Sequence, residues 1–163
     1  MNHMKSFFLL FYILLFLSVS IYAQGIKAYS ADDVIHRCSS KDTVYIINFW
    51  ATWCVPCVQE LPEFNKLENM YAGKPVKVLL VSLDFKEDHT YKLQSFLDRK
   101  HITPEVVWLS DTDPNVFEPK IDNSWQGSIP ATVIVQRGKQ FKKFIEGMIT
   151  EEEVSAIVDK ELK

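Results

Sequence analysis

The chain has 163 residues, of which 47% are hydrophobic and 24% are charged, so it is long enough to fold around one full hydrophobic core. Its formal net charge of −3 and the absence of a basic stripe exclude a typical nucleic-acid-binding protein. Three cysteines are too few for a small scaffold held together by disulfides.

The first 23 residues have the pattern of an export signal. Lys5 precedes an unbroken apolar run from Phe7 to Leu17, and smaller residues then lead to Ala23. We expect a signal peptide that is cleaved after Ala23. An uncleaved membrane anchor is the alternative, because the segment has the minimum length for a bilayer span. Both readings place the folded part, residues 24–163, outside the cytoplasm, in the periplasm, where disulfides persist.

Helices and strands are expected to alternate along the folded part. In chain order, the sequence predicts a helix over residues 30–38, a strand over 43–49, a long helix over 54–72, a strand over 76–83, a helix over 90–100, a short strand over 106–109, a loop with a helical turn over 113–121, a strand over 131–135 with a hairpin partner over 140–145, and a final helix over 150–162. Such alternation predicts an α/β domain of three layers around a mixed central sheet.

Cys54 and Cys57 stand two residues apart where a predicted strand gives way to the long helix. A haem attachment site is excluded, because Val58 occupies the place of the required histidine. A structural zinc site needs four ligands, and His36 and Cys38 are poorly spaced to supply the other two. A purely structural disulfide would close too small a loop to stabilise the fold by much.

A redox role for the pair has a physical basis. Free backbone N–H groups and the helix dipole at a helix start favour an anion, so the pKa of Cys54 should fall. Cys57 lies one turn further in and should be shielded. The pattern therefore indicates an attacking thiolate, Cys54, backed by a resolving thiol, Cys57.

Two segments carry a resemblance to a known family. Asn48–Cys57, with the sequence NFWATWCVPC, resembles the active-site segment of the thioredoxin superfamily, and Gly127–Thr132, GSIPAT, resembles its cis-proline loop. The resemblance implies a thioredoxin-like fold over residues 24–163 and thiol–disulfide oxidoreductase activity without a cofactor or metal. It also implies that Cys54 and Cys57 form a redox-active disulfide.

The same resemblance implies a substrate-binding surface. A cis peptide bond before Pro130 would leave the backbone of Ile129 free to pair with an extended substrate segment. Trp53, just before the first cysteine, would cover the pair and contact the substrate. Trp50 is expected to be a core residue, and Trp108 has no assigned role. Trp125 is expected to be a packing residue, with a place at the rim of the site as the alternative.

The segment after the pair is similar to one branch of the superfamily, the exported TlpA-like oxidoreductases, several of which act in cytochrome c maturation. Cys57-Val58-Gln59-Glu60-Leu61-Pro62 matches the C-x-x-E-x-P pattern of this branch, in which the glutamate tunes the pair. A solvated helix carboxylate is the alternative for Glu60. Classical thioredoxins have a buried aspartate where this chain has Asn48, which cannot titrate. Residues 85–122 resemble the central αβ insertion of the branch.

The direction of electron flow is inferred from Val55 and Pro56. Strongly oxidising members of the superfamily have a histidine there, so its absence favours a reductant or an isomerase. The expected partners are disulfide-containing or dithiol exported proteins and an upstream membrane electron donor. The alternative is a non-catalytic redox-sensing or metal-carrying adaptor, although copper carriers on this fold separate their cysteines by three residues. A peroxidase is disfavoured, since Ala51 stands where its threonine is required.

Cys38 is the remaining cysteine. A free cysteine is most often a small buried apolar side chain, and this is the expected role of Cys38. A regulatory or third redox thiol is the alternative.

Overall fold

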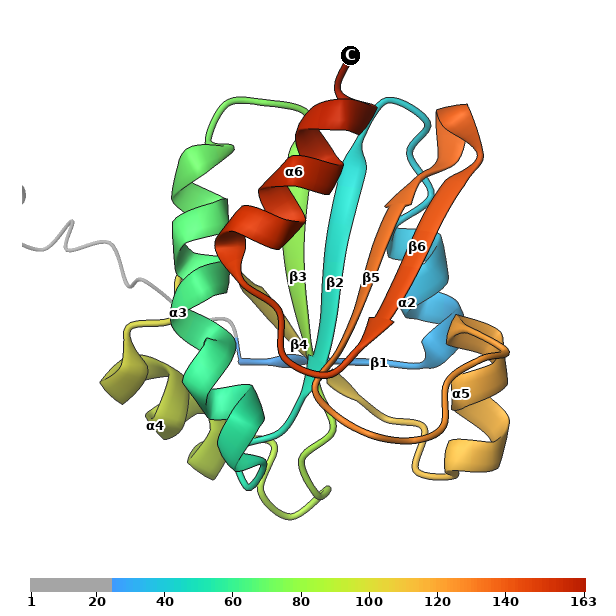
Figure 1. Ribbon diagram of the computed structural model, residues 1–163. Coiled ribbons are helices and arrows are strands. Elements are labelled where there is room, and N and C mark those ends of the chain that lie inside the picture. The colour runs from blue at the N-terminus through green and yellow to red at the C-terminus, as the bar shows by residue number, and fades with distance from the viewer. Residues whose placement is uncertain (1–24) are drawn as a thin grey trace, which may run out of the picture.

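The computed structural model describes residues 25–163, so the expected signal peptide or membrane anchor over residues 1–23 lies outside the described part (Figure 1). The elements are β1 (Lys27–Tyr29), α2 (Ala31–Arg37), β2 (Val44–Trp50), α3 (Val55–Met70), β3 (Val76–Ser82), α4 (Tyr91–Lys100), β4 (Glu105–Leu109), α5 (Pro114–Ile121), β5 (Ala131–Gln136), the 3₁₀ turn η1 (Arg137–Lys139), β6 (Phe141–Glu146) and α6 (Glu151–Glu161). Between residues 25 and 163, no helix is both long and apolar enough to span a bilayer.

The six strands form one sheet in the order β1-β4-β3-β2-β5-β6. Strands β1, β4, β3 and β2 pair in parallel, whereas β5 is antiparallel to β2 and β6 is antiparallel to β5. The mixed sheet predicted from the sequence is therefore confirmed. Strand β2 lies at its centre, and all seven of its residues are buried, as expected for a strand covered on both faces.

Helices cover both faces of the sheet and create two cores, as Figure 1 shows. Ile46 and Leu80 face one core, where they pack with α3, α4 and α6. Phe49 and Val81 face the other core, which α2 and α5 close. Since successive strand residues point to opposite faces, one unbroken apolar run such as β2 supplies both cores. This is the three-layer arrangement that the sequence predicted.

Two elements differ from the sequence prediction. Residues 114–121 form a helix of two turns, α5, where a loop with one helical turn was expected. Asp113 caps it by accepting from the backbone N–H of Asn115, and Pro114 occupies the first turn, where a proline costs little. Strand β1 was not predicted, because three residues are too few for a periodic signal. It is recognisable only from its pairing with β4.

Candidate active site

Cys54 and Cys57 form a disulfide at the start of α3, with Cα atoms 5.3 Å apart. Cys54 is the N-cap residue and is 6% exposed, whereas Cys57 is fully buried, so Cys54 is the more accessible of the two. The backbone N–H of Cys57 donates to Sγ of Cys54 at 3.3 Å. The helix start can therefore stabilise a thiolate on Cys54 once the disulfide is reduced.

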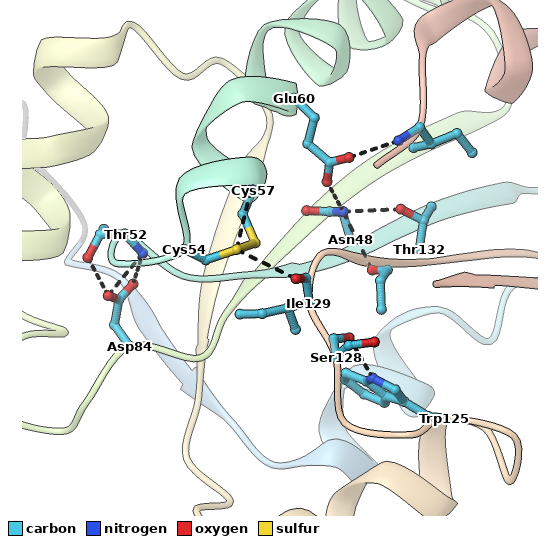
Figure 2. Close-up of a disulfide and its surroundings, with 12 residues drawn as sticks. Asn48, Thr52, Cys54, Cys57, Glu60, Asp84, Trp125, Ser128, Ile129 and Thr132 are labelled. Carbon is cyan, nitrogen blue, oxygen red and sulfur yellow. Dashed lines mark hydrogen bonds between the residues drawn. A yellow bond between two sulfur atoms is a disulfide. The ribbon is translucent and has the colours of Figure 1, made fainter. Parts of the chain in front are cut away.

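The loop before β5 lies beside this sulfur. The carbonyl oxygen of Ile129 is 3.7 Å from Sγ of Cys54, and the Ile129–Pro130 peptide bond is cis. Within residues 25–163, the backbone N–H of Ile129 donates no hydrogen bond. Trp125, placed by the sequence analysis among the packing residues, donates from its indole N–H to the carbonyl oxygen of Ser128 at 3.0 Å. Figure 2 shows this loop passing next to the disulfide.

A buried carboxylate, Asp84, holds the segment that leads into Cys54. Asp84 follows β3 and accepts hydrogen bonds from the backbone N–H of Thr52 at 3.1 Å, from the Thr52 hydroxyl, and from the Ser82 hydroxyl at 2.7 Å. The indole N–H of Trp108 donates to the Asp84 carbonyl oxygen at 2.7 Å. Asp84 was not identified from the sequence. One sequence feature could have indicated it. Asp84 directly follows β3, which is parallel to β2, the strand before Cys54, and the ends of parallel strands meet at one edge of the sheet.

Glu60 projects from α3 into the core and is only 1% exposed, so a solvated surface carboxylate is wrong. Its Oε1 accepts from Nδ2 of Asn48 at 2.8 Å, and its Oε2 accepts from the backbone N–H of Ile149 at 3.0 Å (Figure 2). Asn48 also donates to Oγ1 of Thr132 at 3.1 Å. Burial raises the pKa of Glu60 to about 7, although both hydrogen bonds to its carboxylate act in the opposite direction. Glu60 can therefore gain or lose a proton near neutral pH.

Exposed apolar side chains flank Cys54 in the sequence. Trp53 is 54% exposed and Phe85 is 63% exposed, and their rings stack with centroids 6.0 Å apart. Val55, between the two cysteines, is also exposed. A cluster of exposed apolar side chains is typical of an interaction surface. Phe85 was not identified from the sequence, since its contact with Trp53 depends on the neighbouring ends of β2 and β3.

Cys38 is not part of this site. It is buried on the other face of the sheet, in the core that α2 and α5 close. Burial raises the pKa of its thiol to about 12, so the thiolate does not form near neutral pH. The expectation of a small buried apolar side chain is confirmed. Across residues 25–163, no three His, Cys, Asp or Glu side chains gather in a way that could hold a metal ion.

Comparison with known proteins decides the family. The model of the AhpC/TSA family matches residues 22–143, which is more than half of the chain. The chain belongs to the AhpC/TSA family. Among curated relatives of this AhpC/TSA protein is the thiol-disulfide oxidoreductase ResA of Geobacillus thermodenitrificans, 29% identical over 66% of this chain and 57% of the relative. The thioredoxin-like protein YneN of Bacillus subtilis is 35% identical over 42% of this chain and 39% of its own. The AhpC/TSA chain thus spans less than two thirds of the length of these relatives.

Solved structures confirm the thioredoxin-like fold of this AhpC/TSA chain. A thioredoxin-related protein from Neisseria meningitidis serogroup B superposes with a TM-score of 0.64 and 24% identity, over 75% of this chain and 87% of the other. StoA from Bacillus subtilis gives a TM-score of 0.59 and 23% identity, over 73% and 84%. Proteins named thiol-disulfide oxidoreductase are among the curated relatives of the chain, in line with the resemblance read from the sequence.

Proposed function

We propose that the chain is a thiol–disulfide oxidoreductase that reduces or exchanges disulfides in exported proteins through Cys54 and Cys57. One observation carries the proposal: the disulfide lies at a helix start, and its more accessible cysteine, Cys54, lies beside an unpaired backbone segment at Ile129. Its similarity to proteins named thiol-disulfide oxidoreductase supports the same activity.

The reaction needs only the two sulfurs. In the reduced protein, the Cys54 thiolate attacks one sulfur of a substrate disulfide, and the other substrate sulfur leaves as a thiolate that takes up a proton. The Cys57 thiol then loses its proton and attacks Sγ of Cys54. The substrate sulfur that was bonded to Cys54 leaves as a thiolate, and the Cys54–Cys57 disulfide forms. Two electrons have then passed to the substrate. Because Cys57 is buried, the substrate can form its mixed disulfide only with Cys54.

Glu60 is the group proposed to exchange the proton in the resolving step. It lies three residues after Cys57 on α3, so the two side chains occupy adjacent turns of one helix face. A pKa of about 7 lets Glu60 accept a proton and return it at neutral pH. Asn48, which cannot titrate, is proposed to orient Oε1 of Glu60 through its 2.8 Å hydrogen bond.

The proposed substrate surface combines backbone and aromatic contacts. The free N–H of Ile129 and its carbonyl oxygen would pair with an extended substrate segment, and Pro130 would fix the course of the loop there. Trp53 and Phe85 would pack against apolar side chains near the substrate disulfide. Pairing through the backbone accepts many sequences, which suits a range of protein substrates.

The sequence features favour a reductant in the periplasm. Val55 and Pro56 offer no histidine to stabilise the reduced state, so the pair is expected to act as a reductant. After each turnover, a membrane electron donor would have to reduce the Cys54–Cys57 disulfide again. The expected export of the chain rests on the pattern of residues 1–23. Apocytochromes that await haem attachment would present the required disulfide in an extended segment and are candidate substrates.

The reduction potential of the Cys54–Cys57 pair tests the proposal. The protein would be equilibrated in glutathione and dithiothreitol redox buffers, and its alkylated thiols counted by mass. A potential near that of thioredoxin, about −270 mV, is expected of a reductant. A potential near about −120 mV would instead identify an oxidant that makes disulfides. Failure of the pair to cycle at all would leave the adaptor as the better reading.

A further inference from the structure

Three donors of the loop before Pro130 converge on one carboxylate oxygen of β6. Oε1 of Glu146 accepts from the backbone N–H of Gln126 at 3.2 Å, from the backbone N–H of Ser128 at 3.1 Å, and from the Ser128 hydroxyl at 2.5 Å. No Lys, Arg or His of the described residues forms an ion pair with Glu146. The interactions of this carboxylate are therefore made with the loop.

The residue that follows these donors is the one beside the reactive sulfur. Ser128 precedes Ile129, whose carbonyl oxygen is 3.7 Å from Sγ of Cys54. On the other side of Ile129, the backbone N–H of Gly147 donates to the carbonyl oxygen of Pro130 at 2.8 Å. The end of β6 thus holds the chain on both sides of Ile129 and leaves only Ile129 unpaired between the two anchors.

The rest of the loop is shaped to bring its N–H groups to Glu146. Gly127 has a φ of +84°, which residues with a Cβ atom rarely adopt, and a Cβ there would also lie 3.1 Å from Oε1 of Glu118. Burial raises the pKa of Glu118, and the nearby charge of Glu146 adds to this effect. Two carboxylates therefore flank the loop, and only Glu146 accepts its hydrogen bonds.

We propose that Glu146 is a positioning residue that presents the backbone of Ile129 for substrate pairing. The inference rests on the proposed oxidoreductase function and deepens it. Glu146 touches neither sulfur nor substrate. It acts through Gln126 and Ser128, which fix where the N–H and carbonyl groups of Ile129 stand relative to Cys54. A charged acceptor suits this task, because hydrogen bonds to an ionised oxygen are about twice as strong as neutral ones.

The test compares a protein substrate with a small one. In the full chain, Glu146→Ala should raise KM for insulin, used as the protein disulfide with dithiothreitol as reductant, by about tenfold, equivalent to about 1.4 kcal/mol. The value of kcat should stay within about twofold, because the cysteines are untouched. The rate at which the reduced protein reacts with 5,5′-dithiobis(2-nitrobenzoate) should not change, since this small disulfide needs no backbone pairing.

Two milder variants keep the test decisive if Glu146→Ala does not fold. Glu146→Gln keeps a neutral acceptor oxygen and should give a KM between those of the wild type and the alanine variant. Ser128→Ala removes only the hydroxyl donor and should raise KM by less than Glu146→Ala. Glu152→Ala, which removes an exposed carboxylate from α6, is the matched control and should leave KM unchanged.

The outcomes separate this inference from the function on which it rests. A wild-type protein that does not reduce insulin would overturn the proposed function and, with it, the role of Glu146. An active wild type with an unchanged KM in the folded Glu146 variants would overturn the positioning role alone. A fall in kcat together with slower reaction of the small disulfide would also overturn it, since Glu146 would then act on the cysteines themselves.

Discussion

Asn48 and Glu60, which lie 12 residues apart in the sequence, meet inside the core, where Nδ2 of Asn48 donates to Oε1 of Glu60 at 2.8 Å. A neutral amide is thus a partner of a carboxylate that is almost fully buried. Because an amide cannot neutralise the charge, burial remains the dominant influence and raises the pKa of Glu60 to about 7. We therefore expect both the stability of the protein and its proposed activity to depend on pH near neutrality.

The first prediction concerns stability and pH. The pKa of Glu60 rises from 4.5 in the unfolded chain to about 7 in the fold, so the native state binds more protons between these values. Stability should therefore fall as pH increases from about 4.5 to about 7, by about 3 kcal/mol from this group. Glu60→Gln should remove this part of the pH dependence. Urea unfolding of both proteins at several pH values measures it, and parallel stability curves would contradict the prediction.

The second prediction concerns activity and pH. If Glu60 exchanges the proton of Cys57, the rate of the resolving step in the wild type should change around pH 7. Glu60→Gln should lose that change while the domain stays folded. Stopped-flow measurement of the release of a mixed disulfide from Cys54 gives the rate directly. An identical pH profile in the two proteins would exclude Glu60 from the proton transfer.

Substitution of Cys54 and substitution of Cys57 should have different effects on activity. Cys54→Ala removes the sulfur of the more accessible cysteine, so disulfide reduction should fall to the uncatalysed rate. Cys57→Ala keeps the attacking sulfur and loses the resolving one, so a mixed disulfide with the substrate should accumulate. Mass spectrometry of the protein after mixing with a disulfide peptide detects the adduct. Full turnover in both single variants would be incompatible with the mechanism.

Asp84 should be important for stability. Asp84→Ala removes the acceptor for three donors of Thr52 and Ser82 and leaves them unpaired, so the free energy of unfolding should fall by about 2–4 kcal/mol. Thr52→Val is the matched variant. It loses only the hydroxyl bond and keeps the backbone N–H, so about 1 kcal/mol is expected. Urea unfolding of the reduced and oxidised forms measures both, and equal losses would contradict the assignment of the donors.

Cys38 should be chemically silent in the native protein. With its pKa raised to about 12 by burial, its thiol should resist iodoacetamide at pH 8, whereas reduced Cys54 should be alkylated quickly. After unfolding in urea, both should react. Peptide mapping by mass spectrometry distinguishes the sites. Rapid native alkylation of Cys38 would point back to a third redox thiol.

The sequence was most informative where local chemistry determines structure. The helix starts at Cys54, Ser30 and Thr150 and the central strand β2 depend on neighbouring residues, and each lies where it was expected within a residue or two. The proximity of Glu60 to the pair followed from helical spacing in the same way. Its burial did not, because that depends on how α3 packs on the sheet.

The contacts that complete the site depend on long-range register instead. Asp84 reaches Thr52 across 32 residues, and Glu146 reaches Ser128 across 18. The first contact requires β2 and β3 to end side by side, and the second requires Ala131 to pair with Glu146. Neither register has a local sequence signal. This is why the sequence did not identify either carboxylate.

The two outer strands of the sheet have a consequence for behaviour in a concentrated compartment. β1 has only three residues, and β6 carries Lys142 and Lys143 along its exposed length. Edge strands that are short or carry lysines discourage strands of other molecules from pairing with a sheet. A protein with the function proposed above would thereby be protected from polymerising with its substrates, and it could accept an extended substrate backbone at Ile129 without offering that segment a sheet edge to join.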